Sequence, residues 1–225
     1  MALSRTIQAV LFDLDGTLVD SAPDLLAALA WLRRSHGLPA LDYPALRHHA
    51  SRGALGIIEA GFADCPELDR QALRQAFVER YAERYWVESR AFDGIEALLV
   101  TLQTAGLGLA VVTNKLWRLA APLVAAAGWE DIFACVIGGD TTAQPKPHPA
   151  PVLEACRRLG IHPGNAIMVG DDVRDIEAGR QAGCLTAAAT WGYIAPGQDP
   201  RQWPVNHHLA QPKDLHLILN EIRNV

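Results

Sequence analysis

The sequence lacks a long hydrophobic run, an excess of positive charge and any closely spaced pair of cysteines. No apolar run approaches the roughly 20 residues that a membrane-spanning helix needs, so we expect no membrane partner. The 20 lysine and arginine residues are outnumbered by 25 acidic residues, which argues against a nucleic-acid partner. The apolar stretch 10–12 is interrupted at once by Asp13, so we expect no signal peptide.

Cysteine is also scarce, with four residues scattered along the chain. This pattern is typical of thiols packed as small hydrophobic side chains, and it predicts a cytoplasmic protein. The chain has 225 residues, of which 50% are hydrophobic. That is enough for one large core and a smaller second unit.

Five short apolar runs predict strands with little internal alternation, as expected where parallel strands are buried on both faces. These runs are 7–12, 108–113, 135–138, 166–170 and 184–189. Helical patterns follow at 94–105, 115–127, 149–159, 174–182 and 213–222. Strands that alternate with helices predict an α/β fold, a doubly wound parallel sheet with right-handed crossovers.

Residues 18–92 carry helical patterns and no strand pattern. We therefore expect an all-helical cap domain at 18–92, inserted into a core formed by residues 1–17 and 93–225. Helices are predicted at 45–62 and 69–87, and Ser21 with Asp24 predicts an imperfect capping box before another helix. Pro23 and Gly94 are hinge candidates. Because ligands bind at the carboxyl edge of open α/β sheets, the cap is expected to cover the site.

Aspartates follow two of the predicted strands directly. Asp13 and Asp15 lie in "LFDLDGTLVDS", and Asp171 and Asp172 lie in "MVGDDVRD". If the two strands are neighbours, Asp13 and Asp171 converge, and adjacent carboxylates either share a proton or bind a cation. A hard cation with oxygen ligands is the natural choice, so we expect Mg²⁺ as the cofactor.

Two other segments supply hydrogen-bond donors and a positive charge. "VVTN" ends a predicted strand with Thr113 and Asn114, and "QPKPHP" places Lys146 between prolines. Carboxylates, a cation, a hydroxyl and a lysine around one crevice are the components of a phosphoryl-transfer site. An aspartate in such a site can attack phosphorus and form an aspartyl-phosphate.

The ordered set "DLDGT", "TN", "K" and "GDDVRD" resembles the four motifs of the haloacid dehalogenase superfamily. The resemblance covers the whole chain, and the insertion looks like the helical C1 cap of that family on a Rossmann-like core. It implies that Asp13 is the nucleophile and that Asp15 is the general acid and base.

The resemblance also implies a ligand set and supporting roles. Mg²⁺ would be held by the Asp13 carboxylate, the Asp15 main-chain carbonyl and Asp171. The phosphoryl group would be held by Thr113, Asn114 and Lys146. Asp175 would orient Lys146 or a metal-bound water without itself binding the metal. Asp172 stands where relatives often carry a hydroxyl residue, so its role is open.

Members of this superfamily catalyse several reactions, and the residues present favour phosphate hydrolysis. Dehalogenation needs neither Asp15 nor a metal, and phosphonate cleavage needs a cap lysine. The chain has three lysines, and none lies between residues 18 and 92. We therefore expect a magnesium-dependent phosphoric monoester hydrolase. A phospholigand-binding protein without turnover is the alternative from another class, although it would have no need of Asp15.

The substrate is left open between two small phosphate monoesters. "PKPHPAP" and the cap pattern resemble phosphoglycolate phosphatases, whereas "GDDVRDIEAGRQAG" and "AAATWGYIAPGQDPRQW" resemble N-acetylmuramic acid 6-phosphate phosphatases of cell-wall recycling. Arg52, in "HHASRGALG", either pairs with the carboxylate that both substrates carry or is a solvated residue at a helix end. The apolar stripe of the helix at 69–87 belongs to the cap core or to a dimer contact, so a monomer or a homodimer is expected.

Overall fold

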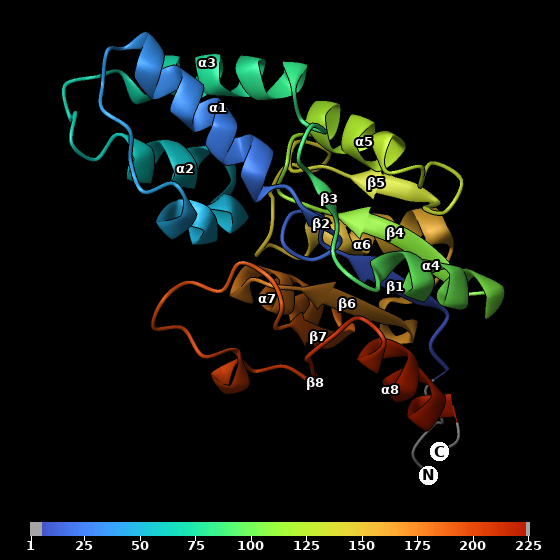
Figure 1. Ribbon diagram of the computed structural model, residues 1–225. Helices are drawn as coiled ribbons and strands as arrows, with labels where there is room; N and C mark the ends of the chain where they lie inside the picture. The colour runs from blue at the N-terminus through green and yellow to red at the C-terminus, as the bar shows by residue number, and fades with distance from the viewer. Residues whose placement is uncertain (1–5, 224–225) are drawn as a thin grey trace.

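Six parallel strands form the central sheet of the computed structural model, which describes residues 6–223. The strands are β1 (Ala9–Phe12), β4 (Gly108–Val112), β5 (Cys135–Ile137), β6 (Ala166–Gly170), β7 (Leu185–Ala189) and β8 (His207–Leu209). Their order is β5-β4-β1-β6-β7-β8, which places β1 inside the sheet (Figure 1). The predicted α/β architecture and the five predicted strands are confirmed, whereas β8 was not predicted.

Helices cover both faces of this sheet (Figure 1). One face carries α4 (Ile95–Thr104), α5 (Trp117–Ala126) and α8 (Asp214–Arg223), and the other carries α6 (Ala150–Leu159) and α7 (Val173–Ala182). In β1, Val10 and Phe12 point into the first layer and Leu11 into the second, as strand alternation requires. Short 3₁₀ helices lie at η2 (Pro163–Asn165) and η3 (Pro200–Gln202). Within residues 6–223, no helix is long and apolar enough to cross a membrane.

The register of the sheet brings three strand ends to one level. Phe12, the last residue of β1, is paired with Val111 of β4 on one side and Val169 of β6 on the other. Because parallel strands end at the same edge, the loops that follow them meet there. This placement gathers the motif residues that the sequence separates by more than 150 positions.

Residues 22–83, which lie between β1 and α4 in the chain, form a helical unit with its own apolar core, called the cap. It contains α1 (Ala22–Ser35), the 3₁₀ helix η1 (Pro44–Arg52), α2 (Gly53–Gly61) and α3 (Arg70–Glu83). The predicted single helix at 45–62 is wrong, because η1 ends at Arg52 and α2 begins at Gly53, whose φ of +63° interrupts a continuous helix. The cap helices pack around Leu29, Phe62 and Phe77, and they also contact Leu119 of α5.

The two chain segments that join this helical unit to the sheet are bound to each other. They pair as the antiparallel strands β2 (Val19–Asp20) and β3 (Arg90–Ala91). The carboxylate of Asp24 also accepts hydrogen bonds from the main-chain N–H groups of residues 87–89 and from the Ser89 hydroxyl. The cap at 18–92, the core at 1–17 and 93–225, and the hinges at Pro23 and Gly94 stay predictions. Residues 1–5 and 224–225 of that core lie outside the described residues.

The predicted capping box at the start of α1 is wrong. Ser21 is the N-cap residue, but its side chain makes no capping hydrogen bond, and its hydroxyl donates to the carboxylate of Asp15. The carboxylate of Asp24 likewise accepts hydrogen bonds from the main chain of residues 87–89 and not from the start of α1. Both polar side chains therefore bind the loops near the sheet edge rather than the helix end.

Candidate active site

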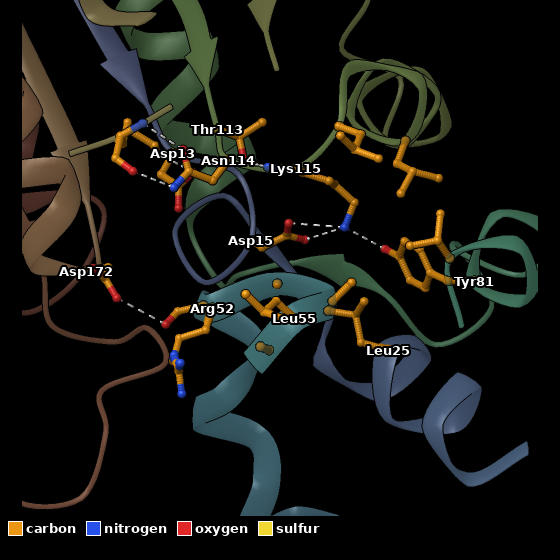
Figure 2. A pocket seen from close by; sticks show the side chains of 18 of the residues that line it. Asp13, Asp15, Leu25, Arg52, Leu55, Tyr81, Thr113, Asn114, Lys115 and Asp172 are labelled. Carbon is orange, nitrogen blue, oxygen red and sulfur yellow. Dashed lines mark hydrogen bonds and ion pairs between the residues drawn. The ribbon is translucent and has the colours of Figure 1, made fainter. Parts of the chain in front are cut away.

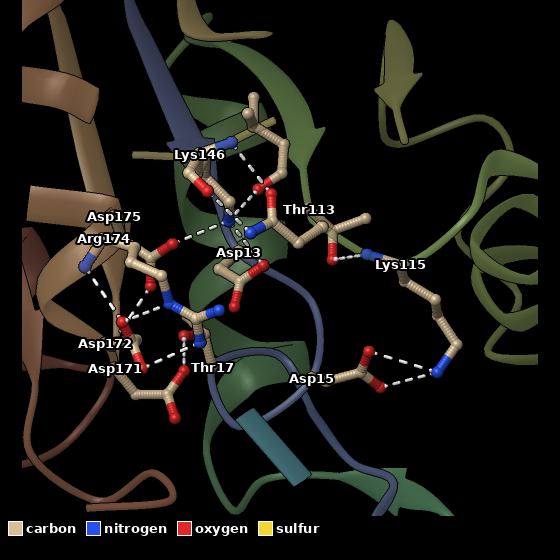
Figure 3. A network of polar contacts seen from close by, with 12 residues as sticks. Asp13, Asp15, Thr17, Thr113, Lys115, Lys146, Asp171, Asp172, Arg174 and Asp175 are labelled. Carbon is tan, nitrogen blue, oxygen red and sulfur yellow. Dashed lines mark hydrogen bonds and ion pairs between the residues drawn. The ribbon is translucent and has the colours of Figure 1, made fainter. Parts of the chain in front are cut away.

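Lys146 lies at the centre of the polar groups at the sheet edge (Figure 3). Its ammonium is 2.8 Å from Asp13 Oδ1 and 2.7 Å from Asp175 Oδ1, and it donates to the main-chain oxygen of Val112 at 2.6 Å. Burial alone would lower the pKa of Lys146, but Asp13 and Asp175 raise it above its usual value. The lysine is therefore held as a buried cation against the predicted nucleophile.

Three carboxylates face one another beside this lysine. Oxygen atoms of Asp13, Asp171 and Asp175 all lie within 4.8 Å of one another, and all three residues are buried. Burial raises the pKa of Asp171 well above its usual value, and the charges of Asp13 and Asp175 raise it further. Burial likewise raises the pKa of Asp175 to about 7, although Lys146 opposes the shift. One lysine does not neutralise three carboxylates, so the cluster has the charge and the oxygen donors that suit a divalent cation.

The orientation of Asp171 is fixed by two donors. The Thr17 hydroxyl donates to its Oδ1 at 2.9 Å, and the main-chain N–H of Tyr193 donates to its Oδ2 at 2.9 Å. Gly16, with φ +90°, leaves the space that Asp171 occupies, because a Cβ at that position would overlap the carboxylate. This close approach is the physical reason for glycine in "DLDGT".

Asp15 is directed away from the three carboxylates and toward Lys115 (Figure 3). Lys115 Nζ lies 3.0 Å from Asp15 Oδ1 and 3.1 Å from Oδ2. The hydroxyl of Ser21, the residue before α1, also donates to Oδ1. The hydroxyl of Tyr81, on α3, lies 3.0 Å from the same ammonium. Asp13 and Asp15 are thus two residues apart in sequence but have different cationic partners.

Thr113 and Asn114 follow β4 beside Asp13, and their side chains have different partners. The Asn114 amide donates to the main-chain oxygen of Lys146 and accepts from its main-chain N–H, each at 2.9 Å. Asn114 therefore fixes the loop that carries Lys146, whose peptide bond to Pro147 is cis. The Thr113 oxygen accepts from the Lys115 main-chain N–H at 3.2 Å, which leaves its own proton available for a ligand.

Asp172 and its neighbour Arg174 connect the core to the cap. It caps α7 in a box with Asp175 and forms an ion pair with Arg174 at 2.7 Å. Arg174 also donates to the main-chain oxygen of Ser51 at 2.7 Å, and the Ser51 hydroxyl lies 3.4 Å from Asp172. Asp172, whose role the sequence left open, therefore orients the arginine that contacts the cap.

Arg52 lies on the cap side of the cavity (Figure 2). Its guanidinium pairs with Glu59 at 2.8 Å, and 53% of the side chain is exposed. In this structure it is a solvated residue next to the cavity, and its pairing with a substrate carboxylate stays a prediction.

The cavity lies between the sheet edge and the cap, with polar and apolar walls (Figure 2). The core supplies Asp13, Asp15, Lys115 and Lys146. The apolar wall consists of Leu25, Leu55, Phe77, Val78, Leu116 and Leu119. A ligand in this cavity would therefore meet both charged groups and hydrocarbon side chains.

The structure brings together most of the predicted site residues. Thr113, Asn114 and Lys146 gather around Asp13, while Arg52 stands at the rim. Sequence reasoning assigned no role to Thr17, Ser51, Tyr81, Lys115 and Arg174. Lys115 had a usable signal, because it directly follows "TN" and is one of three lysines. Tyr81 had none, because its position in an apolar helical stripe indicated only cap core.

Comparisons with known proteins agree with this geometry. A family model described as haloacid dehalogenase-like hydrolase matches residues 7–183. The chain is 42% identical over 217 residues to an N-acetylmuramic acid 6-phosphate phosphatase of Pseudomonas aeruginosa, covering 95% of each chain. It is 41% identical over 211 residues to a phosphoglycolate phosphatase of Xanthomonas campestris pv. campestris, covering 94% of this chain and 96% of the relative.

The fold agrees equally well with a solved structure. The crystal structure of a predicted phosphoglycolate phosphatase from Haemophilus somnus superposes with a TM-score of 0.86 at 27% identity, covering 97% of this chain and 99% of the other. These similarities confirm the predicted superfamily and the predicted phosphoric monoester hydrolase activity. The chain belongs to the haloacid dehalogenase-like hydrolase family.

Proposed function

We propose that this protein hydrolyses a small phosphate monoester through an aspartyl-phosphate on Asp13, with Mg²⁺ as its cofactor. The contact of Lys146 with both Asp13 and Asp175, beside Asp171, carries the proposal. One lysine beside three carboxylates forms a site for a dianionic phosphate only when a second cation offsets the remaining negative charge. A divalent ion held by Asp13, Asp171 and Asp175 would supply that charge and polarise the phosphoryl oxygens.

In the first step, a carboxylate oxygen of Asp13 attacks phosphorus. The bond from phosphorus to the ester oxygen breaks, and this oxygen takes the electron pair and a proton from Asp15. Lys146 remains beside Asp13 and faces the negative charge of the phosphoryl group. Thr113 can donate its hydroxyl proton to the same group, and Asn114 acts by holding the loop of Lys146.

In the second step, Asp15 accepts a proton from water as the water oxygen attacks phosphorus. The bond between Asp13 and phosphorus breaks, which releases inorganic phosphate and restores both carboxyl groups. The Asp15 carboxylate is held in place by Lys115 and Ser21, which both donate to it. The two aspartates therefore divide the chemistry between a nucleophile held by Lys146 and a proton carrier held by Lys115.

Release of phosphate from an aryl phosphate, with Mg²⁺ and with EDTA, tests this function. We expect turnover with Mg²⁺, loss of turnover to the buffer rate in EDTA, and recovery when Mg²⁺ is added in excess. Retained activity in EDTA would contradict the metal requirement. Absence of turnover with Mg²⁺ on aryl phosphate and on both substrates considered below would favour the binding protein without catalysis.

The apolar wall bears on which monoester is the substrate. 2-Phosphoglycolate has a single methylene between its phosphate and its carboxylate, so it offers little to contact the leucines and Phe77. N-Acetylmuramic acid 6-phosphate carries an acetyl methyl, a lactyl methyl and a sugar ring. Leu55 lines the cavity with 49% of its surface exposed, which leaves it available for such a group. The wall favours the amino-sugar phosphate, the second of the two substrates considered.

We expect kcat/KM for N-acetylmuramic acid 6-phosphate to exceed that for 2-phosphoglycolate by about tenfold or more, because a buried methyl group contributes about this much. Leu55→Ala should reduce the ratio severalfold by removing part of the wall. Leu217→Ala is the matched control, since Leu217 is an exposed leucine on α8. A ratio near one would show that the apolar wall does not discriminate between the two substrates, and a ratio in favour of 2-phosphoglycolate would make the smaller substrate the preferred one.

A further inference from the structure

A continuous polar connection runs from the cap to Asp15 (Figure 2). Tyr81 of α3 contacts Lys115, which follows β4, and Lys115 contacts both carboxylate oxygens of Asp15. The Lys115 ammonium also lies 4.4 Å from the centroid of the Tyr81 ring. Three distant parts of the chain thus meet at one ammonium group, and one of them belongs to the cap.

This connection is buried. The side chain of Lys115 is 6% exposed, that of Asp15 is 12% exposed, and Tyr81 is 1% exposed. Taking an ion pair out of water is unfavourable, and a well-packed apolar pair would serve stability as well or better. The cap already has its own apolar core around Phe62 and Phe77. Stability therefore gives a weak reason for placing a lysine and an aspartate here.

Catalysis gives a stronger reason. In the proposed function, Asp15 must place one oxygen beside the leaving oxygen and later beside a water molecule. An aspartate side chain has several rotamers, and a displacement of about 1 Å is enough to slow proton transfer severely. Lys115 and Ser21 donate to the carboxylate from two directions and so select one orientation. Tyr81 in turn fixes the ammonium of Lys115.

We propose that Lys115 and Tyr81 are positioning residues, which hold the Asp15 carboxylate for proton transfer and make its position depend on contact with the cap. The inference rests on the proposed function, in which Asp15 serves both steps. Lys115 differs in this from Lys146, which lies against the nucleophile Asp13. If Lys115 instead binds the phosphoryl group, its removal will weaken inhibition by inorganic phosphate, which a positioning role does not require.

The test compares an alkyl with an aryl phosphate in Lys115→Met. Departure of an alkoxide needs the proton from Asp15, whereas 4-nitrophenolate is stable without it. We expect kcat/KM for N-acetylmuramic acid 6-phosphate, or for 2-phosphoglycolate, to fall about 10²-fold, at the lower end of general acid catalysis. For 4-nitrophenyl phosphate, kcat/KM should change less than about threefold, because it reports the first step.

The same variant should show a burst with 4-nitrophenyl phosphate. Formation of the aspartyl-phosphate remains fast, but its hydrolysis slows because the water has lost a well-placed base. About one nitrophenolate per active site should appear before a slower steady rate. Inhibition by inorganic phosphate should stay within about threefold of the wild-type value. A burst of this kind does not arise from partial unfolding, which only reduces the concentration of sites.

Tyr81→Phe provides a second variant that keeps the ring and the packing of the cap core. Loss of its hydroxyl removes one hydrogen bond to Lys115, so we expect the same selective loss on the alkyl phosphate, up to about tenfold. Lys213→Met and Tyr85→Phe are matched controls outside the cavity and should leave both substrates unchanged. Tyr81→Phe also keeps the test decisive if Lys115→Met does not fold.

Equal losses on alkyl and aryl phosphates, without a burst, would overturn the positioning role. Weakened phosphate inhibition in Lys115→Met would overturn it in favour of phosphate binding. Neither result affects the proposed function, which is tested separately by turnover of the wild-type protein with Mg²⁺ and with EDTA. Asp15→Asn serves as the reference, because it should reproduce the selective loss at greater magnitude, about 10²–10⁴-fold.

Discussion

Asp13→Asn is expected to reduce turnover by at least about 10⁴-fold on every phosphate monoester, because an amide oxygen does not form a stable bond to phosphorus. The substitution keeps the shape of the side chain, and Lys146 keeps its contact with Asp175. We therefore expect the protein to fold and still bind inorganic phosphate. Steady-state assays would measure the loss, and calorimetry with inorganic phosphate would measure the binding that remains.

A trapping experiment separates loss of the nucleophile from loss of geometry. Wild-type protein quenched in acid during turnover of radiolabelled substrate should carry label on Asp13, and Asp13→Asn should carry none. Asp131→Asn is the matched control, because Asp131 is an exposed aspartate outside the cavity. Label on another residue, or Asp13→Asn activity above about 1% of wild type, would exclude Asp13 as the covalent nucleophile.

The parts of the fold that the sequence predicted are those whose physical signal is local. Buried parallel strands are short apolar runs, so β1, β4 and β6 could be located from composition alone. β8 has the sequence His-His-Leu and a single buried residue, so it carries no such signal. The break between η1 and α2 depends on the positive φ of Gly53, which many helical glycines do not adopt.

The candidate site divides in the same way. Asp13 and Asp171 were predicted together because each follows a strand, and strand ends converge. The partner of Asp15 was not predicted, because Lys115 is 100 residues away and a lysine in a loop has no preferred partner in sequence. Ser21 was assigned to a helix cap from its local neighbours, but the carboxylate of Asp15 is the stronger acceptor for its hydroxyl.

Asp175 shows how tertiary contacts extend a motif. The resemblance implied that Asp175 is not itself a metal ligand but orients Lys146 or a metal-bound water. In the structure Asp175 contacts Lys146, and its carboxylate also lies within 4.8 Å of Asp13 and Asp171. α7 begins at Val173, so its first turn directs Asp175 back to the sheet edge beside the residue that ends β6. Burial and neighbouring charge raise the pKa values of Asp171 and Asp175 in this cluster, with a measurable effect on stability.

Without a divalent ion, the protein should lose stability as the pH rises from about 4 to about 7. The folded-state pKa values of Asp171 and Asp175 lie above the unfolded value near 3.8, with that of Asp175 at about 7. Across this window the folded state holds protons that the unfolded chain has released, so the free energy of unfolding falls. Lys146 does not contribute here, because its raised pKa keeps it charged in both states. The pKa shift of Asp175 alone, from 3.8 to about 7, corresponds to a loss on the order of 4 kcal/mol, or about 8–16 °C in Tm.

Thermal unfolding in EDTA and in Mg²⁺ from pH 5 to pH 8 would measure this effect. We expect the gain in Tm from Mg²⁺ to be small at pH 5 and to grow as the carboxylates ionise, since the bound cation offsets their charge. Other titrating groups contribute equally to both conditions, so the difference isolates the cluster.

Asp171→Asn sharpens the test by removing one of the three charges. In EDTA at pH 8 it should unfold at a higher temperature than the wild type, although it is inactive, and Mg²⁺ should raise its Tm little. The exposed Asp131→Asn should behave as the wild type at every pH. A gain from Mg²⁺ that is independent of pH, or an Asp171→Asn protein less stable than wild type in EDTA at pH 8, would show that these carboxylates are not in electrostatic conflict. The cluster would then have no physical need of a second cation, and a metal at this sheet edge would have no electrostatic basis.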